Sequence, residues 1–108
     1  MSTTPEGLIK NKITEWMKNL EKKGYPVYVE RRQAGGLAYR KGIPDIYAII
    51  NGEHLEIEVK APGGHLSTMQ EKFRDRMKRI NCKYICVNSV LEFKQFILNN
   101  FGINDDAW

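Results

Sequence analysis

The dipeptide Asn51-Gly52, between two apolar-rich runs, is the feature that most constrains the fold of this chain. A two-residue hairpin loop of type I′ needs positive φ at both central positions, and Asn-Gly adopts them readily. The runs are 46–50 and 54–59, and a two-residue loop fixes their pairing by counting. The predicted pairs are Ile50 with Glu53, Ala48 with Leu55, and Asp45 with Glu58.

This register gathers two acids and a base at the open end of the hairpin. Residues directly opposite in an antiparallel pair point to the same side, so Asp45 and Glu58 lie together. Lys60 follows Glu58 by two positions and joins them, whereas Ile57 and Val59 face a core. Two opposed carboxylates need a positive charge between them, which a divalent cation supplies. The alternative is a solvated strand face with a Glu–Lys pair.

These residues match a known pattern. Pro44-Asp45 followed by Glu58-Val59-Lys60 resembles the signature of the PD-(D/E)XK nucleases. With Gly42-Ile43 before it, Gln70 on the next helix and Glu6 on a first helix, nearly the whole chain resembles the virus-type replication-repair nuclease (VRR-NUC) branch of that superfamily. The resemblance implies an endonuclease that hydrolyses DNA phosphodiesters with Mg²⁺ or Mn²⁺ as its cofactor.

Length and composition set the class of protein. We expect residues 1–108 to form one nuclease domain, because this length supports a single core. No apolar run approaches the roughly 18 residues of a membrane span, and no signal peptide is visible. Cys82 and Cys86 would lie about 13 Å apart on one strand, too far for a disulfide. We therefore expect a cytoplasmic protein, of a bacterium or of the host cell of a phage. The net charge of +4 favours a polyanionic partner only mildly.

Periodicity and capping signals predict seven elements in the order α-β-β-β-α-β-α. The second helix would cross over between strands 54–59 and 83–88, so these strands should be parallel neighbours. The fold class is α/β, with helices on a small mixed sheet of about four strands, like the restriction-endonuclease core of the superfamily. The first helix should end by about residue 22, the remaining strands are 27–32 and 46–50, and Ser67 and Ser89 should cap the other two helices. The buried stripe of the second helix should contain Met69, Phe73, Met77 and Ile80.

Glu6 and Gln70 each have two interpretations. Glu6 falls on the apolar face of the first helix, where a carboxylate is costly unless paired or bound to metal. Thr3-x-x-Glu6 and Ser67-x-x-Gln70 also fit capping boxes, in which both side chains would serve the helix ends. The resemblance implies that Glu6 helps to bind metal or water and that Gln70 lies near the scissile phosphate. The residues alone leave these alternatives open.

Asp45 and Glu58 are the predicted metal ligands, with the Val59 carbonyl as a third and Glu6 as a further candidate. The carbonyl is suitable because the Val59 side chain faces the core while its backbone lines the site. Lys60 would orient the attacking water or stabilise charge in the transition state. The predicted catalytic residues are therefore Asp45, Glu58, Lys60, Gln70 and Glu6.

Two other residues of the same strand require comment. Glu56 is an additional acid close to the site, and it leaves the number of metal ions, one or two, undecided. His54 is isolated from other ligand-type residues, and we expect it to point away from Glu58 and to be structural.

Basic and aromatic residues near the site suit contact with DNA. Arg and Lys neutralise phosphates, and tyrosine stacks on bases. The second helix carries five Lys and Arg against Glu71 and Asp75, which is more one-sided than an ordinary solvated face. Simple solvation of a basic loop is the alternative. The candidate DNA contacts are Arg31, Arg32, Tyr39, Arg40, Lys41 and Arg74.

The resemblance also bears on substrate and assembly. Stand-alone members of the family, often of phage origin, act as dimers on branched DNA such as four-way (Holliday) junctions, in repair or recombination. A homodimer acting on such DNA is therefore expected, and flap cutting is the nearest alternative. A non-catalytic nucleic-acid-binding module and a dimerisation protein are the other classes. The intact set Asp45, Glu58 and Lys60 favours the enzyme.

Overall fold

The computed structural model describes residues 4–32 and 41–105. Every predicted element is present in the predicted order, and each strand boundary lies within one residue of its expected place. The helices are α1 (Pro5–Lys22), α2 (Thr68–Arg79) and α3 (Val90–Phe101). The strands are β1 (Val27–Arg31), β2 (Ile46–Ile50), β3 (Glu53–Val59) and β4 (Lys83–Val87).

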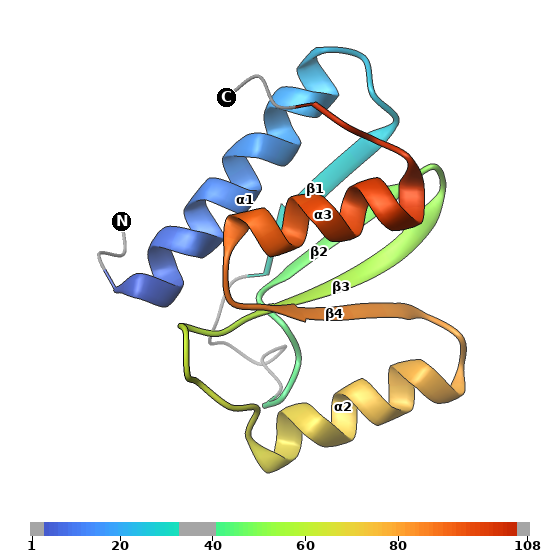
Figure 1. Ribbon diagram of the computed structural model, residues 1–108. Helices are drawn as coiled ribbons and strands as arrows, with labels where there is room; N and C mark the ends of the chain where they lie inside the picture. The colour runs from blue at the N-terminus through green and yellow to red at the C-terminus, as the bar shows by residue number, and fades with distance from the viewer. Residues whose placement is uncertain (1–3, 33–40, 106–108) are drawn as a thin grey trace.

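The strands form one mixed sheet in the order β1-β2-β3-β4 (Figure 1). β1 pairs with β2 and β2 with β3 in antiparallel fashion. β3 and β4 are parallel because α2 carries the chain from the end of one strand back to the start of the other. The predicted α/β fold class and the predicted parallel pair are both confirmed.

The β2–β3 hairpin has the predicted turn and register. φ is 52° and 79° at the two turn residues, Asn51-Gly52, as a type I′ turn requires. Pairing then continues from the turn to Ile46 opposite Ile57. Beyond this pair, the next residues on the two sides of the hairpin are Asp45 and Glu58. The prediction that these two residues lie together at the open end of the hairpin is therefore confirmed.

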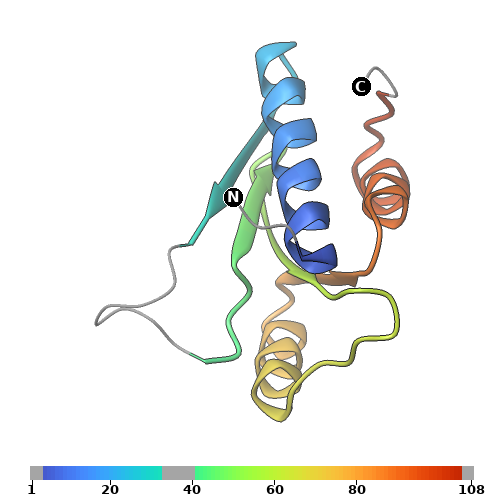
Figure 2. The same cartoon turned by 90° about the vertical axis from the view of Figure 1, so that its left-hand side faces the viewer.

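One face of the sheet forms the hydrophobic core. α1 and α3 both pack on this face and contact each other, and Figure 2 shows the two helices side by side, with α2 apart from them at the lower end. Trp16 of α1 meets Phe93 of α3 edge to face, with ring centroids 6.0 Å apart. The buried strand residues are Val27, Val29, Ile46, Ala48, Ile50, Leu55, Ile57, Val59 and Val87.

The other face of the sheet is only partly covered, by α2. This helix contacts the edge strand β4, and the Phe73 ring lies 6.3 Å from the Tyr84 ring. No α2 residue is fully buried, and Met69 and Ile80 are 46% and 68% exposed. The predicted buried stripe was therefore wrong, because α2 packs mainly against the edge strand β4, whereas α1 packs against β1, β3 and α3.

Candidate active site

The open end of the hairpin lies at the lower edge of the sheet, beside the first turns of α1 (Figure 1). Glu58 is buried there, 5% exposed, and the Asp45 side chain is about half exposed. The charges of Asp45, Lys60, Lys10 and Glu6 all act on Glu58. The fold thus brings four of the predicted site residues into one neighbourhood, together with one that was not predicted.

Glu58 has a buried carboxyl group, and one of its oxygens forms no hydrogen bond with the described residues. Its Oε1 atom is buried and has no hydrogen-bond partner in the described part of the chain. Burial raises the pKa of Glu58 to about 7, with Lys60 opposing the rise and Asp45 adding to it. A buried carboxylate is costly unless it is paired or binds a metal. A cation at this oxygen would remove that cost.

Lys10 is the site residue that the sequence analysis missed. Its Nζ atom lies 2.5 Å from Asp45 Oδ2 and 3.2 Å from Glu6 Oε2. Burial by itself would lower the pKa of Lys10, but the hydrogen bonds and charges of Asp45 and Glu6 outweigh it and raise the pKa. The spacing of Glu6 and Lys10, four residues on a helix, could have predicted their ion pair. The contact with Asp45 is tertiary and has no local signal.

The capping box Thr3-x-x-Glu6, one of the two interpretations of Glu6 that the sequence left open, does not form. Thr4 is the N-cap, and its Oγ1 accepts a hydrogen bond from the backbone N–H of Gly7 at 3.0 Å. Pro5 occupies the first helical position, which makes the preceding residue the cap. Glu6 is therefore not needed at the helix end, and its carboxylate faces Lys10 in the site.

The predicted capping box of α2 is confirmed. Ser67 Oγ accepts from the Gln70 N–H at 3.2 Å, and Gln70 Oε1 accepts from the Ser67 N–H at 2.8 Å. The side-chain oxygen of Gln70 is thus engaged in the helix cap. The role of Gln70 near a scissile phosphate stays a prediction. The amide NH₂ group is the part of the side chain that would fill this role.

Gly42 fixes how the segment before Asp45 approaches α2. Its φ is 89°, and a Cβ on this residue would lie 2.5 Å from the Met69 carbonyl oxygen. Both the conformation and the space therefore require glycine. Gly42 allows the segment that leads through Asp45 into β2 to pass directly beside the first turn of α2.

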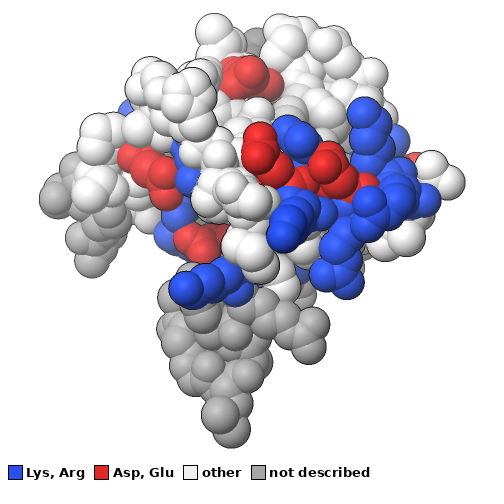
Figure 3. Space-filling model, turned by 90° about the horizontal axis from the view of Figure 1, so that it is seen from below, with Lys and Arg blue, Asp and Glu red and all other residues white. Residues whose placement is uncertain are grey.

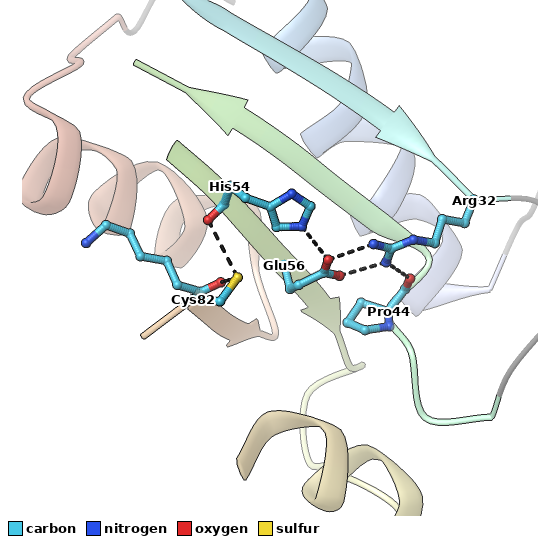
Figure 4. A network of polar contacts seen from close by, with 6 residues as sticks. Arg32, Pro44, His54, Glu56 and Cys82 are labelled. Atoms are coloured by element: carbon cyan, nitrogen blue, oxygen red, sulfur yellow. Dashed lines mark hydrogen bonds and ion pairs between the residues drawn. The ribbon is translucent and has the colours of Figure 1, made fainter. Parts of the chain in front are cut away.

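Arg32, predicted to contact DNA, is held in a network of side chains on the open face of the sheet (Figure 4). Its Nη1 and Nη2 atoms donate to the two oxygens of Glu56 at 2.7 and 2.6 Å. Nη1 also donates to the Pro44 carbonyl at 2.8 Å. The guanidinium is therefore already engaged with protein groups, and a DNA contact by Arg32 stays a prediction.

His54 belongs to the same network. Its Nε2 atom lies 2.5 Å from Glu56 Oε2 (Figure 4). Its ring also stacks on the Tyr47 ring, with the centroids 5.1 Å apart. The expectation that His54 points away from Glu58 was wrong, because residues four apart on a strand share a face. His54, Glu56 and Glu58 line one side of β3, although His54 contacts Glu56 rather than the site.

Tyr84 is a second residue that the sequence did not single out. It lines a cavity of about 390 Å³ between α2 and β4, together with Arg74 and Cys86. Its hydroxyl is buried and has no hydrogen-bond partner among the described residues. Burial raises the pKa of Tyr84, and the charge of Glu58 is the next cause. Tyr84 thus extends the site face from Glu58 toward α2.

The donors fit a hard divalent cation held by few protein ligands. Across residues 4–32 and 41–105, no three His, Cys, Asp or Glu side chains converge on a metal position. Mg²⁺ is commonly bound by one or two carboxylates with several waters, so Asp45, Glu58 and the Val59 carbonyl are sufficient donors. The unsatisfied oxygen of Glu58 favours a cation here, and a cation that also binds Asp45 would compete with Lys10 for that carboxylate.

The surface beside the site is basic. Figure 3 shows Lys and Arg side chains gathered over α2 on the lower face, with acidic side chains among them. Arg31 is exposed and donates to Asn11 Oδ1 at 2.7 Å, and Lys41 is exposed in a turn. Tyr39 and Arg40 lie outside the described residues. None of the described helices is both long and apolar enough to cross a membrane. The basic residues of α2 are Lys72, Arg74, Arg76, Lys78 and Arg79.

Two solved structures are similar to the whole chain. One, a "VRR_NUC domain", has a TM-score of 0.72 and 20% identity, covering 92% of this chain and 99% of its own. The other, a "VRR_NUC domain protein", has a TM-score of 0.75 and 15% identity, covering 97% and 94%. No protein-family model matches the sequence, and the comparison with curated proteins gives no match. At these identities the likeness establishes the fold, and it confirms the fold expected from the sequence motifs.

Proposed function

We propose that this chain, which has the VRR-NUC fold of the PD-(D/E)XK type, is a Mg²⁺- or Mn²⁺-dependent endonuclease that hydrolyses phosphodiester bonds in DNA. The observation that carries the proposal is the buried Oε1 atom of Glu58, which has no hydrogen-bond partner among residues 4–32 and 41–105 and on whose carboxyl group the charges of Lys60 and Asp45 act. A purely structural hairpin has no reason to bury an acid next to another acid at its open end. A site that holds a cation does.

The proposed ligands are Asp45, Glu58 and the Val59 carbonyl, with Glu6 as a further ligand to the metal or to a water. A bound divalent cation polarises a phosphodiester and lowers the pKa of a coordinated water. Lys60, whose charge acts on Glu58, would donate a hydrogen bond to a phosphate oxygen or to the attacking water.

Substrate contact would come from exposed basic groups around the site. Arg31, Lys41 and Arg74 are the described candidates, and Tyr39 and Arg40 are predicted to assist them. Such contacts are to phosphates, so each one lost should weaken binding to all DNA sequences alike and lower the salt dependence. The basic surface of α2 supports this part of the proposal (Figure 3).

We extend the proposal to a homodimer that cuts branched DNA, above all four-way (Holliday) junctions, in repair or recombination in a bacterial or phage-infected cytoplasm. This extension has its basis in the resemblance of the sequence motifs to stand-alone VRR-NUC nucleases. A two-fold dimer presents two equivalent sites, as symmetric incision of a junction requires. Flap cutting is the alternative substrate preference.

The test is a cutting assay on labelled four-way junction, flap and linear duplex DNA, with Mg²⁺, Mn²⁺ or EDTA. Lys60→Ala serves as the control. We expect metal-dependent cutting that the variant lacks, with the junction as the preferred substrate. Equal cutting by the wild type and the variant would identify a contaminating nuclease and would favour a non-catalytic DNA-binding module.

A further inference from the structure

Arg32 holds both carbonyl groups of the Pro44-Asp45 dipeptide. Its backbone N–H donates to the Asp45 carbonyl at 2.6 Å, and its Nη1 donates to the Pro44 carbonyl at 2.8 Å. Pro44 has no N–H, so its carbonyl is its one backbone group for hydrogen bonding. β2 begins only at the residue after Asp45. Arg32 therefore orients this dipeptide at the point where the sheet ladder begins.

Glu56 in turn fixes the orientation of Arg32. The two side chains meet in a bidentate pair at 2.7 and 2.6 Å (Figure 4). Glu56 is 3% exposed. The Arg32 guanidinium also lies over the Tyr47 ring, 4.7 Å from its centroid. The planar Arg32 guanidinium is therefore held in one orientation by contacts with two side chains. A lysine ammonium, which is not planar, would not be fixed in this way.

The pair is better explained by geometry than by stability. A buried ion pair is a weak stabilising device, and apolar residues of similar size often replace it without loss. What apolar residues cannot replace is the hydrogen bond from the guanidinium to the Pro44 carbonyl. Glu56 lies two residues before Glu58 on β3, so the pair links the backbone of one proposed metal ligand to the strand that carries the other.

We infer that Arg32 and Glu56 are positioning residues, which hold the backbone of Pro44-Asp45 so that the Asp45 carboxylate stays aligned with Glu58. We call the contacts of Arg32 with Glu56 and with the carbonyls of Pro44 and Asp45 the clamp. The expected effect of the clamp on catalysis rests on the proposed function, whereas the existence of the clamp does not. Small displacements of a catalytic group lower the reaction rate by large factors. Accurate positioning of Asp45 would therefore offset the desolvation cost of burying Arg32 and Glu56.

The test compares Arg32→Lys and Glu56→Gln with one matched control. Glu53→Gln makes the same chemical change as Glu56→Gln at an exposed position of the same strand. A fourth variant, Arg32→Met with Glu56→Leu, removes the ion pair while keeping apolar volume, so that the result does not depend on an unpaired buried charge. Three quantities are measured: hydrogen exchange of the residue-32 backbone amide by NMR, the Kd of Mn²⁺, and kcat and KM on DNA.

We expect faster exchange of the residue-32 amide in all three clamp variants, by about 10-fold or more, since that amide donates to the Asp45 carbonyl. Mn²⁺ binding should weaken several-fold and kcat should fall by about 10- to 100-fold, while KM for DNA stays within about 2-fold. The double variant should be no worse than the worse single variant, because both substitutions remove one interaction. The control, Glu53→Gln, should match the wild type.

Unchanged amide exchange and unchanged kcat in the double variant would overturn the inference. So would a raised KM and a weaker salt dependence in Arg32→Lys with unchanged kcat, because that result would make Arg32 a DNA contact. If the wild type neither cuts DNA nor binds Mn²⁺, the proposed function fails, and the amide exchange of the variants still decides whether the clamp exists.

Discussion

Alternate residues of β3 lie in two different environments. Leu55, Ile57 and Val59 are fully buried in an apolar core beneath α1 and α3. Glu56 and Glu58 are equally hidden, but they face the other side, where the neighbours are charged groups. The comparison shows that one face of β3 contributes to the stability of the core, whereas the opposite face carries residues of the proposed active site.

The two faces should therefore respond differently to mutation. Removing a side chain from the core face leaves a cavity and costs stability. Removing the charge of Glu58 from the polar face relieves desolvation and repulsion and costs function instead, as expected of a site whose groups are arranged against local stability.

Glu58→Gln should have the largest effect, and on activity alone. We expect DNA cutting to fall by a factor on the order of 10³, because the amide is a poor metal ligand and carries no charge. The melting temperature should stay equal or rise. Rates on junction DNA and thermal unfolding of the same preparation measure both quantities. A Glu58→Gln variant with a lower melting temperature and unchanged specific activity would contradict this prediction, because Glu58 would then contribute to stability rather than to activity.

Ile57→Ala, one residue away, should show the opposite pattern. Ile57 is 1% exposed, so we expect a loss of about 2–5 kcal/mol in the free energy of unfolding, measured by urea denaturation. The folded fraction should keep its kcat. Ile49→Ala is the control, because Ile49 is 39% exposed on the open face and should cost less than about 1 kcal/mol. Equal losses at both positions would remove the distinction between the faces.

The metal-free protein should lose stability as the pH rises from about 5 to 8. The fold raises the pKa of Glu58 from an ordinary 4.5 to about 7, so the folded state favours the protonated form. The stabilising contribution is complete below the unfolded pKa and is lost as pH rises through the folded one. Allowing for solvent screening, the loss is about 2 kcal/mol.

Chemical denaturation in EDTA at several pH values measures this loss. Glu58→Gln should lack that part of the pH dependence, which makes it the control. A wild type and a variant with parallel pH profiles would show that Glu58 titrates alike in the folded and unfolded states.

The smallest expected effect belongs to Lys10. Its ammonium contacts Asp45 and Glu6, so it competes with a divalent cation for the same carboxylates. Lys10→Met should tighten Mn²⁺ binding by about 5-fold, which is the roughly 1 kcal/mol of one like charge in a solvated site. Titration calorimetry measures the Kd, with Lys12→Met on the exposed side of α1 as control. Weaker binding in Lys10→Met would make the lysine a supporting group rather than a competitor.

Local rules of sequence predicted much of this molecule. Asn51-Gly52 defined the turn, counting from it gave the register, and the crossover helix made β3 and β4 parallel. The stripe of α2 was mispredicted because periodicity shows which face a helix would bury, but not whether anything covers it. The same limit of local reasoning applies to the site.

Asp45 and Glu58 were predictable because a hairpin joins them. The contacts Lys10 to Asp45 and Arg32 to Pro44 connect separate elements, and no short-range spacing encodes them. His54 is a different case, since simple alternation already places it on the Glu58 side of the strand. Glu56 was noticed as an acid, but its partner lies on another strand, so its burial in an ion pair emerged only from the fold.

A crystal structure with Mn²⁺, located by its anomalous scattering, tests most directly whether the two acids of the hairpin share a cation. We predict an anomalous peak about 2.1 Å from a carboxylate oxygen of both Asp45 and Glu58, with Lys10 displaced from Asp45. A fully formed site with no peak between these two carboxylates, at Mn²⁺ concentrations that support cutting, would contradict the account.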